Sequence, residues 1–246
     1  MIGVIGYGWV GKAVVKGFSK SPILISDPAY NDLSIQYMCD KNPEAIFVCV
    51  PTPTDNSNYA ILRGVLKEIK DAKYTGLVVV KSTVLPQYIS EFDVQYNPEF
   101  LSRPTAEQDF VRPFMVVIGG ERAKEVWALY EKYSTVQTNN VVFTDLKTAT
   151  LVKYTFNTFY ATKVTFMNQM YDVAQQLGVN FDDYTKIVAM NPNIGSNHLQ
   201  VPGYEGRGYA GPCLPKDTEA LAREYNLELL YTVQSLNSKY RAADKE

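Results

Sequence analysis

The sequence predicts an α/β protein, with a doubly wound parallel sheet in its first part and an all-helical domain after it. Three observations carry this prediction. Short apolar runs alternate with helical patterns up to residue 144, as in a sheet covered by helices. The runs are apolar at nearly every position, which is typical of parallel strands buried on both faces. From residue 145 onwards the strand pattern stops and helical spacing takes over.

Six apolar runs are the expected strands, and we place a domain of residues 1–144 around them. A helix is expected over residues 12–20, between the first two runs. Strand, helix and strand in this order build a doubly wound domain, which binds ligands at the carboxyl edge of its sheet. The runs cover residues 2–6, 22–26, 45–50, 77–81, 94–96 and 115–118.

A single long helix is expected over residues 145–177, because these 33 residues contain neither glycine nor proline. Gly178 follows as a C-cap. At 1.5 Å per residue the helix would be about 50 Å long, and its aromatic residues spread beyond one stripe. A helix with so broad an apolar face needs a partner surface. We therefore expect either a homodimer through this helix or burial of the helix within its own domain.

The remaining segment completes a helical domain of residues 145–246. Residues 190–217 are rich in Gly, Pro and Asn and are expected to form a loop, followed by helices over residues 218–225 and 227–241. The loop holds the only histidine, His198, without the partners of a catalytic or metal-binding residue. We expect His198 to be structural or to line a substrate site, and we expect no metal.

Composition excludes several classes of protein. The chain has 246 residues, with 24 Lys and Arg against 26 Asp and Glu and a net charge of −2, so nucleic acid is not an expected partner. No apolar run reaches the ~20 residues of a membrane helix, and the N-terminus shows no signal peptide. Three cysteines are too few for a disulfide framework, which favours a reducing cytoplasm.

A glycine-rich turn is the first motif with chemical meaning. It has the pattern G-x-G-x-x-G between an expected strand and helix, where backbone N–H groups and the helix dipole bind a pyrophosphate. Asp27 ends the second strand, where a carboxylate binds ribose hydroxyls and repels a 2′-phosphate. NAD is therefore the expected cofactor; the alternative is an ordinary turn with a surface aspartate. The turn comprises Gly6, Tyr7, Gly8, Trp9, Val10 and Gly11.

Further candidates follow later strands at the same edge of the sheet. Glu99 comes after the fifth expected strand and would lie at the ligand-binding edge, unless it is a surface glutamate. Hydroxyl groups after the third and fourth strands suit phosphate, ribose or a reacting oxygen, unless they only cap the next helix. The residues at these two positions are Val50, Pro51, Thr52, Ser82 and Thr83.

The helical part carries two more groups of candidates. Lys153 and Asn157 are four residues apart on one helix face and suit the stabilisation of a developing oxyanion; the alternative is that both are solvated. Cys213 lies in a Gly/Pro loop, where Lys216 and a following helix N-terminus would favour the thiolate. The alternative is a buried structural cysteine. Asp217 either caps that helix or acts as a base.

Taken together, these motifs resemble the UDP-glucose/GDP-mannose dehydrogenase family. The likeness runs in order through GYGWVG, VPTPTD, KSTV, NPEFL, KYTFN and GYAGPCLPKD, and the last motif is the most specific. The resemblance implies oxidation of the 6-alcohol of a nucleotide sugar to the acid with two NAD, with UDP-glucose as the first candidate. It also implies an N-terminal Rossmann domain and a long central helix used in dimerisation.

The resemblance also implies a covalent mechanism. Cys213 would be the nucleophile that forms a thiohemiacetal and then a thioester, so that the second hydride leaves a carbon that bears an oxyanion. Lys153 and Asn157 would stabilise this oxyanion, and Asp217 would assist proton transfer.

Other roles follow from the same resemblance. Glu99 and Thr83 would position the water that hydrolyses the thioester, and Lys216 would lie near the cofactor. The expected substrate contacts are Glu99, Phe100, Leu101, Lys153, Asn157, Tyr209 and Gly211.

The chain departs from the family pattern at several positions. Arg103 stands where many members have Glu, and Asn193 stands where many have Arg. Ala210 and Pro212 replace smaller or different residues around the cysteine. The sequence also stops after the helix that leads into the family's C-terminal domain, so we expect a chain that lacks this nucleotide-binding domain, either as a naturally short form or as a truncated one.

Two alternative functions remain open. The first is a two-electron dehydrogenase of the β-hydroxyacid type, because such enzymes share the Rossmann domain and a helical Lys-x-x-x-Asn but lack the catalytic cysteine. The second is a catalytically impaired NAD-binding module.

Overall fold

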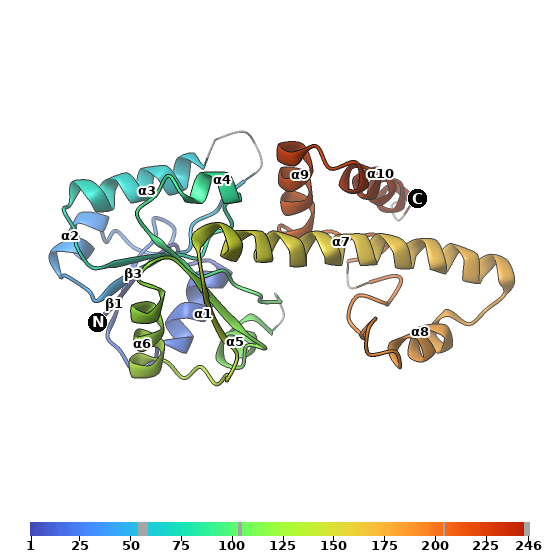
Figure 1. Cartoon of the computed structure of the whole chain (residues 1–246), viewed down its shortest axis with the longest axis horizontal. Coiled ribbons are helices and arrows are strands. Elements are labelled where there is room, and N and C mark those ends of the chain that lie inside the picture. The colour runs from blue at the N-terminus through green and yellow to red at the C-terminus, as the bar shows by residue number, and fades with distance from the viewer. Residues whose placement is uncertain (54–58, 103–104, 204, 244–246) are drawn as a thin grey trace. The chain divides into compact units, whose positions relative to one another are not determined.

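The computed structural model describes residues 1–53, 59–102, 105–203 and 205–243. The chain divides into two compact units, Met1–Lys153 and Tyr154–Glu246, which are described one at a time (Figure 1). This division falls inside the long helix α7 (Leu146–Leu177). The domain boundary expected from the sequence lies at the start of the same helix.

Within the described residues, the first unit contains a seven-stranded sheet in the order β2-β1-β3-β4-β5-β6-β7. All neighbouring strands are parallel except β5 and β6. The chain changes its direction of travel across the sheet between β1 and β3, which is the place where doubly wound folds bind ligands. The strands are β1 (Ile2–Ile5), β2 (Ile23–Ser26), β3 (Ala45–Val48), β4 (Leu77–Val80), β5 (Gln95–Tyr96), β6 (Val116–Gly119) and β7 (Val141–Thr144).

The doubly wound sheet is confirmed, but its predicted parallel pairing is wrong at one strand. β6 runs antiparallel to β5. Continuous apolar runs indicate burial on both faces and carry no information on strand direction, and β6 is buried at all four positions. The sequence also does not predict β7, an edge strand whose Val142 and Phe143 are exposed.

Helices cover both faces of this sheet, as Figure 1 shows. β3 illustrates how one strand feeds two cores, because successive side chains point to opposite faces. Phe47 packs with Phe18 in one core, while Ile46 packs in the other. On the face of Phe47 lie α1 (Trp9–Gly17), α5 (Ala106–Val111) and α6 (Ala123–Tyr133), and on the other lie α2 (Ile35–Asp40), α3 (Ala60–Asp71) and α4 (Pro86–Ile89).

The long helix of the sequence prediction is present almost as expected. α7 begins one residue later, because Asp145 caps it by accepting a hydrogen bond from the Thr148 N–H at 2.9 Å. Gly178 ends the helix with a φ of +66°, a left-handed conformation that favours glycine.

The second unit adds three helices within the described residues: α8 (Phe181–Ala189), α9 (Leu214–Tyr225) and α10 (Glu228–Ala243). α8 is not predicted from the sequence. The helix expected over residues 218–225 starts four residues earlier, because Pro215 lies in the first turn of α9, where proline is tolerated. No helix of the described residues is long and apolar enough to cross a membrane.

Candidate functional site

The glycine turn of the first unit has the geometry of a phosphate-binding loop. Gly6 has a φ of +89°, and a Cβ there would lie 2.7 Å from the Cys49 carbonyl oxygen. A Cβ at Gly11 would collide with the Gly6 carbonyl oxygen, whereas one at Gly8 would meet nothing within 4 Å. The first and third glycines therefore permit the tight turn, and the second leaves the backbone open to a ligand.

Helix α1 starts at Trp9, within this glycine-rich segment and three residues before the position expected from the sequence. Gly8 is its N-cap and provides no side-chain hydrogen bond, and Trp9 and Val10 open the first turn. The end of the helix therefore presents N–H groups and the positive end of its dipole, which suit an anionic group.

Asp27 lies directly after β2 and next to the glycine turn. Its Oδ2 accepts a hydrogen bond from the Tyr7 N–H at 2.5 Å, and its Oδ1 accepts one from the Ala29 N–H at 2.8 Å. These bonds fix the carboxylate beside the loop, at the position where a doubly wound domain binds the ribose of its cofactor.

The hydroxyl residues at the carboxyl edge differ in their surroundings. The Ser82 hydroxyl donates to the Val50 carbonyl oxygen at 2.7 Å and thereby ties the ends of two strands together. Thr52 is buried, Thr83 is half-buried and Pro51 is exposed. Ser82 therefore shapes the edge through its hydroxyl, a role that the sequence does not indicate.

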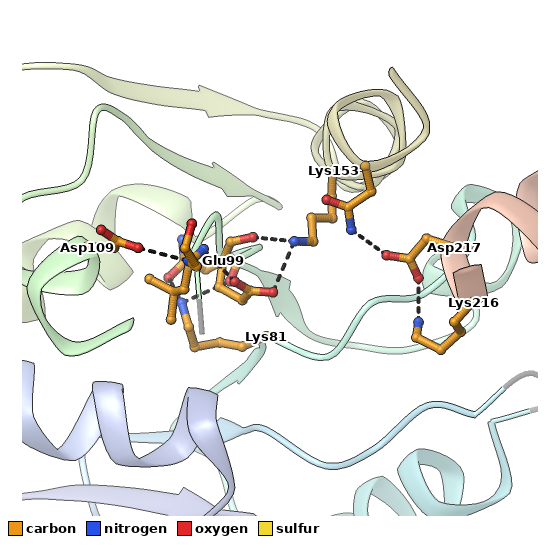
Figure 2. A network of polar contacts seen from close by, with 10 residues as sticks. Lys81, Glu99, Asp109, Lys153, Lys216 and Asp217 are labelled. Carbon is orange, nitrogen blue, oxygen red and sulfur yellow. Dashed lines mark hydrogen bonds and ion pairs between the residues drawn. The ribbon is translucent and has the colours of Figure 1, made fainter. Parts of the chain in front are cut away.

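Glu99 and Lys153 form a buried ion pair inside the first unit (Figure 2). The Lys153 Nζ lies 3.0 Å from Glu99 Oε1 and donates to the Glu99 carbonyl oxygen at 2.6 Å. The other carboxylate oxygen, Oε2, accepts from the Leu101 N–H at 2.7 Å. Glu99 is thus no surface glutamate, and Lys153 is not solvated.

The electrostatic balance at Glu99 favours its charged form. Burial alone would raise its pKa, but the charge of Lys153 and the hydrogen bond from Leu101 outweigh burial, and the pKa lies below its usual value. The ammonium of Lys153 also lies over the Phe100 ring, 5.7 Å from its centroid. An ionised carboxylate in this setting can accept a hydrogen bond from a water molecule.

Lys81 is a buried residue at this edge that sequence reasoning missed. It directly follows β4, and its Nζ donates to Asn97 at both the carbonyl oxygen, at 3.1 Å, and Oδ1, at 2.8 Å. The sequence signals are a lysine after an apolar run and its place at the start of the motif KSTV, and neither reveals burial.

In the second unit, Asp217 is buried in the first turn of α9 and accepts two hydrogen bonds. Asn157 Nδ2 on α7 donates to its Oδ2 at 2.5 Å, and Lys216 Nζ donates to its Oδ1 (Figure 2). Asn157 is buried as well. The structure therefore brings these three predicted residues together, and Asp217 lies inside α9, not in the loop before it.

Cys213 is the N-cap residue of α9 and is exposed. A thiol at a helix N-terminus experiences the positive end of the dipole, which favours the thiolate. The other two cysteines differ, because burial raises the pKa of Cys39 and raises that of Cys49 to about 12. Cys213 is thus the accessible thiol among the three.

The segment before Cys213 is fixed by helices α7 and α10. The Tyr209 N–H donates to Asn237 Oδ1 at 2.7 Å, and Asn237 Nδ2 donates back to the Tyr209 carbonyl oxygen at 3.0 Å. Asn168 Oδ1 accepts from the Gly208 N–H at 3.2 Å. Tyr209 is buried, and burial raises its pKa to about 12. Gly211 is exposed, with a φ of +77°.

The remaining candidates contribute less. The His198 ring stacks on Tyr160 with centroids 4.5 Å apart, and partial burial, followed by the charge of Lys163, lowers its pKa. Asn193 is exposed in the loop after α8. Arg103 lies outside the described residues.

The fold and the glycine turn define the first unit as a Rossmann dinucleotide-binding domain. The comparisons with known proteins place the chain more narrowly. Residues 30–137 match the NAD-binding domain, and residues 147–239 match the central domain, of the UDP-glucose/GDP-mannose dehydrogenase family. The chain belongs to this family.

Named relatives agree with this assignment. The chain is 37% identical over 198 residues to the UDP-glucose 6-dehydrogenase of Rickettsia felis, an alignment that covers 74% of this chain and 43% of that protein. It is 31% identical over 222 residues to UDP-glucose 6-dehydrogenase YwqF of Bacillus subtilis, covering 81% and 49%. The chain thus spans less than half the length of these relatives.

Solved structures show the same architecture. A UDP-glucose dehydrogenase from Pyrobaculum islandicum superposes with a TM-score of 0.81 at 25% identity, over 97% of this chain and 68% of that one. A 3-hydroxyisobutyrate dehydrogenase from Mycobacterium tuberculosis superposes with a TM-score of 0.70 at 11% identity, covering 99% and 94%. The second likeness shows the fold alone.

Proposed function

We propose that the chain acts as an NAD-dependent dehydrogenase that oxidises the 6-alcohol of a nucleotide sugar to the acid. The observation that carries the proposal is the exposed Cys213 at the start of α9, with a buried Asp217 in the same first turn bonded to Asn157. A two-electron dehydrogenase has no chemical use for an accessible nucleophile, whereas a four-electron oxidation does.

The proposed cofactor site is the glycine turn with Asp27. Residues 6–11 and the start of α1 would hold the pyrophosphate, and Asp27 would hold the ribose. Val50, Pro51, Thr52, Ser82 and Thr83 would border the rest of the cofactor, with Lys216 near it. Two NAD molecules, bound one after the other, would supply the hydride acceptors for the two oxidations.

In the proposed reaction the sugar is oxidised twice at one carbon. The alcohol loses a hydride and its hydroxyl proton, with Asp217 assisting the proton transfer, and becomes an aldehyde. The Cys213 thiolate then adds to the aldehyde carbon, and the thiohemiacetal oxyanion expels a second hydride to leave a thioester. Lys153 and Asn157 donate hydrogen bonds to the oxyanion as its charge develops.

Hydrolysis of the thioester completes the proposed cycle. Glu99 and Thr83 would position a water molecule for attack on the thioester carbon, which releases the acid and regenerates Cys213. The ionised state of Glu99 supports this role, because a carboxylate accepts a hydrogen bond from the attacking water and directs its lone pair. Phe100, Leu101, Tyr209 and Gly211 are the remaining proposed substrate contacts, and UDP-glucose is the proposed first substrate.

We also propose a homodimer through α7. Phe159, Phe166 and Val173 are exposed on this helix at seven-residue spacing, the repeat of a helix seam that faces a second helix. Phe166→Asp should lower the mass measured by light scattering to that of one chain. Gln175→Asp, at an exposed residue on the opposite side of the same helix from Phe166, should leave it unchanged. A monomeric wild type would contradict the dimer.

The reducing cytoplasm remains a prediction from the cysteine content.

The activity is tested by turnover on a panel of nucleotide sugars. The purified chain should reduce NAD with UDP-glucose, Cys213→Ala should abolish formation of the acid, and Cys39→Ala should retain it. Iodoacetamide should inactivate the wild type by alkylating Cys213. Activity that survives iodoacetamide would favour the β-hydroxyacid type. NAD binding without turnover on any sugar would favour an impaired NAD-binding module.

A further inference from the structure

Lys81 lies in the interior of the first unit, at the carboxyl end of β4. Only 4% of its surface is exposed, and its Nζ lies 5.5 Å from the centroid of the Phe110 ring. Burying an ammonium group is costly unless charges or hydrogen bonds compensate it. Hydrophobic packing alone therefore does not account for a buried lysine at this position, and its polar partners have to be considered.

Asn97 is the hub of these contacts. Besides the two bonds from Lys81, its Oδ1 accepts from the Tyr130 hydroxyl at 2.6 Å, and its Nδ2 donates to the Val117 carbonyl oxygen at 2.7 Å. Its backbone N–H donates to the Val80 carbonyl oxygen at 2.9 Å. The residue is thus fixed by β4, β6 and α6, immediately before the turn that carries Glu99.

Charged groups around Lys81 link it to the same carboxylate. Burial lowers the pKa of Lys81 to about 8; Cys49 and Glu99 act in the opposite direction, and Lys153 acts with burial. In return, the charge of Lys81 helps to lower the pKa of Glu99, after the larger influences of burial, Lys153 and Leu101. Lys81 therefore acts on Glu99 without touching it.

We infer that Lys81 is a positioning residue for Glu99: it fixes Asn97, which leads into the turn that carries Glu99, and it adds a second buried cation to this part of the fold. The inference rests on the proposed function only for the role of Glu99 in hydrolysis. A neutral side chain would be enough to hold Asn97 in place, since Tyr130 and Val117 already bind it. A purely structural role therefore does not explain why this buried side chain is a charged one.

Two variants separate the two contributions. Lys81→Met removes both the donor and the charge, whereas Lys81→Gln keeps a donor and removes the charge. Lys70→Met, at the exposed end of α3, is the matched control. The readout is the pH titration of the Glu99 carboxyl carbon by NMR in protein with ¹³C-labelled glutamate, with the signal assigned from Glu99→Gln.

In both Lys81 variants the Glu99 carboxyl should titrate at higher pH than in the wild type, and in the control it should not move. An unchanged titration in Lys81→Met would overturn the inference and leave Lys81 a structural residue. If Lys81→Met fails to fold, Lys81→Gln decides the charge contribution alone. Tyr130→Phe, which removes one bond to Asn97 and no cation, should leave the Glu99 titration in place.

Turnover gives the second readout. With UDP-glucose, Lys81→Met should lower kcat by about tenfold or more while KM changes little, because the misplaced group acts in the chemical step. A drop in kcat without a shift of the Glu99 titration would contradict the charge contribution. A wild type without turnover would contradict the proposed function instead, and the NMR result would still stand.

Discussion

Each of the two units contains a buried carboxylate, and the two carboxylates differ in the partners that stabilise them. In the first unit Glu99 forms an ion pair with Lys153, whose side chain is only 5% exposed, and accepts a hydrogen bond from a backbone N–H. In the second unit Asp217 is bonded to an uncharged amide and to Lys216, whose side chain is 21% exposed. In the first arrangement both charged side chains are buried, whereas in the second the lysine is partly exposed to solvent.

The different partners of Glu99 and Asp217 suit the two carboxylates to different roles. A carboxylate held by a buried cation and a backbone donor stays ionised and orients what it binds. Asp217, by contrast, is bonded to a lysine side chain that reaches solvent. This difference is consistent with the roles that we propose, water positioning for Glu99 and proton transfer for Asp217.

The largest expected effect comes from breaking the buried pair. Lys153→Met leaves the Glu99 carboxylate buried without its ion-pair partner, so the free energy of unfolding should fall by about 3–5 kcal/mol. Urea unfolding followed by circular dichroism measures this loss. Restoration of stability in the double variant Lys153→Met with Glu99→Gln would show that the cost comes from the unpaired charge.

The next prediction concerns how the contribution of Glu99 to the free energy of unfolding depends on pH. The folded-state pKa of Glu99 lies below its usual 4.5, so the unfolded state binds more protons in this range. Glu99 therefore contributes stability that is fully present above pH 4.5 and is lost as the pH falls through the lower folded-state pKa. Unfolding of the wild type and Glu99→Gln should accordingly converge on acidification.

Exposed Glu44 serves as the contrast for this pH effect. Its pKa is also lowered, first by the hydrogen bond from Tyr133 and then by Lys132, but solvent and salt screen such a group. Its contribution should shrink in high salt, whereas that of Glu99 should persist. Equal salt sensitivity of the two would contradict the burial of the Glu99 pair.

A smaller effect is expected in the second unit. Asn157→Ala removes the amide that binds Asp217 and leaves Lys216 in place, so stability should fall by about 1–3 kcal/mol. Lys216→Met should cost about 1 kcal/mol or less, because this lysine is partly solvated. If Lys216→Met proves as costly as Lys153→Met in urea unfolding, the contrast between the two units fails.

The smallest expected effect concerns the segment that leads to Cys213. Asn237→Ala removes both bonds to the Tyr209 backbone, so the segment should become more mobile while α10 keeps its packing through Leu230 and Val233. Alkylation of Cys213 by iodoacetamide should change by a few-fold in rate. Ser238→Ala, on the exposed side of the same helix, should leave the rate unchanged.

Much of the fold could be predicted from the sequence because local chemistry determines it. The glycine turn, Asp27 and the extent of α7 follow from backbone requirements and from the absence of helix breakers. The direction of β6 could not be predicted, because burial looks the same in either direction. The start of α9 was obscured by Pro215, although proline is common in a first helical turn. α8 had one usable signal, the N-cap Asn180 that accepts from the Asp183 N–H.

The candidate site was predictable only where a motif contained its residues. Cys213, Asp217, Lys153 and Asn157 lie in motifs that carry their chemistry. Lys81, Ser82 and Val50 also lie in motifs, KSTV and VPTPTD, but their contacts depend on strands that meet only in the folded sheet, which no spacing along the chain reveals.

The measurement that tests the central claim most directly is the number of NADH molecules formed per molecule of UDP-glucose consumed by the purified chain. We expect two, because in the proposed reaction both hydrides leave the same carbon, one before and one after the covalent step at Cys213. One NADH per sugar, with the aldehyde as the final product, would contradict it.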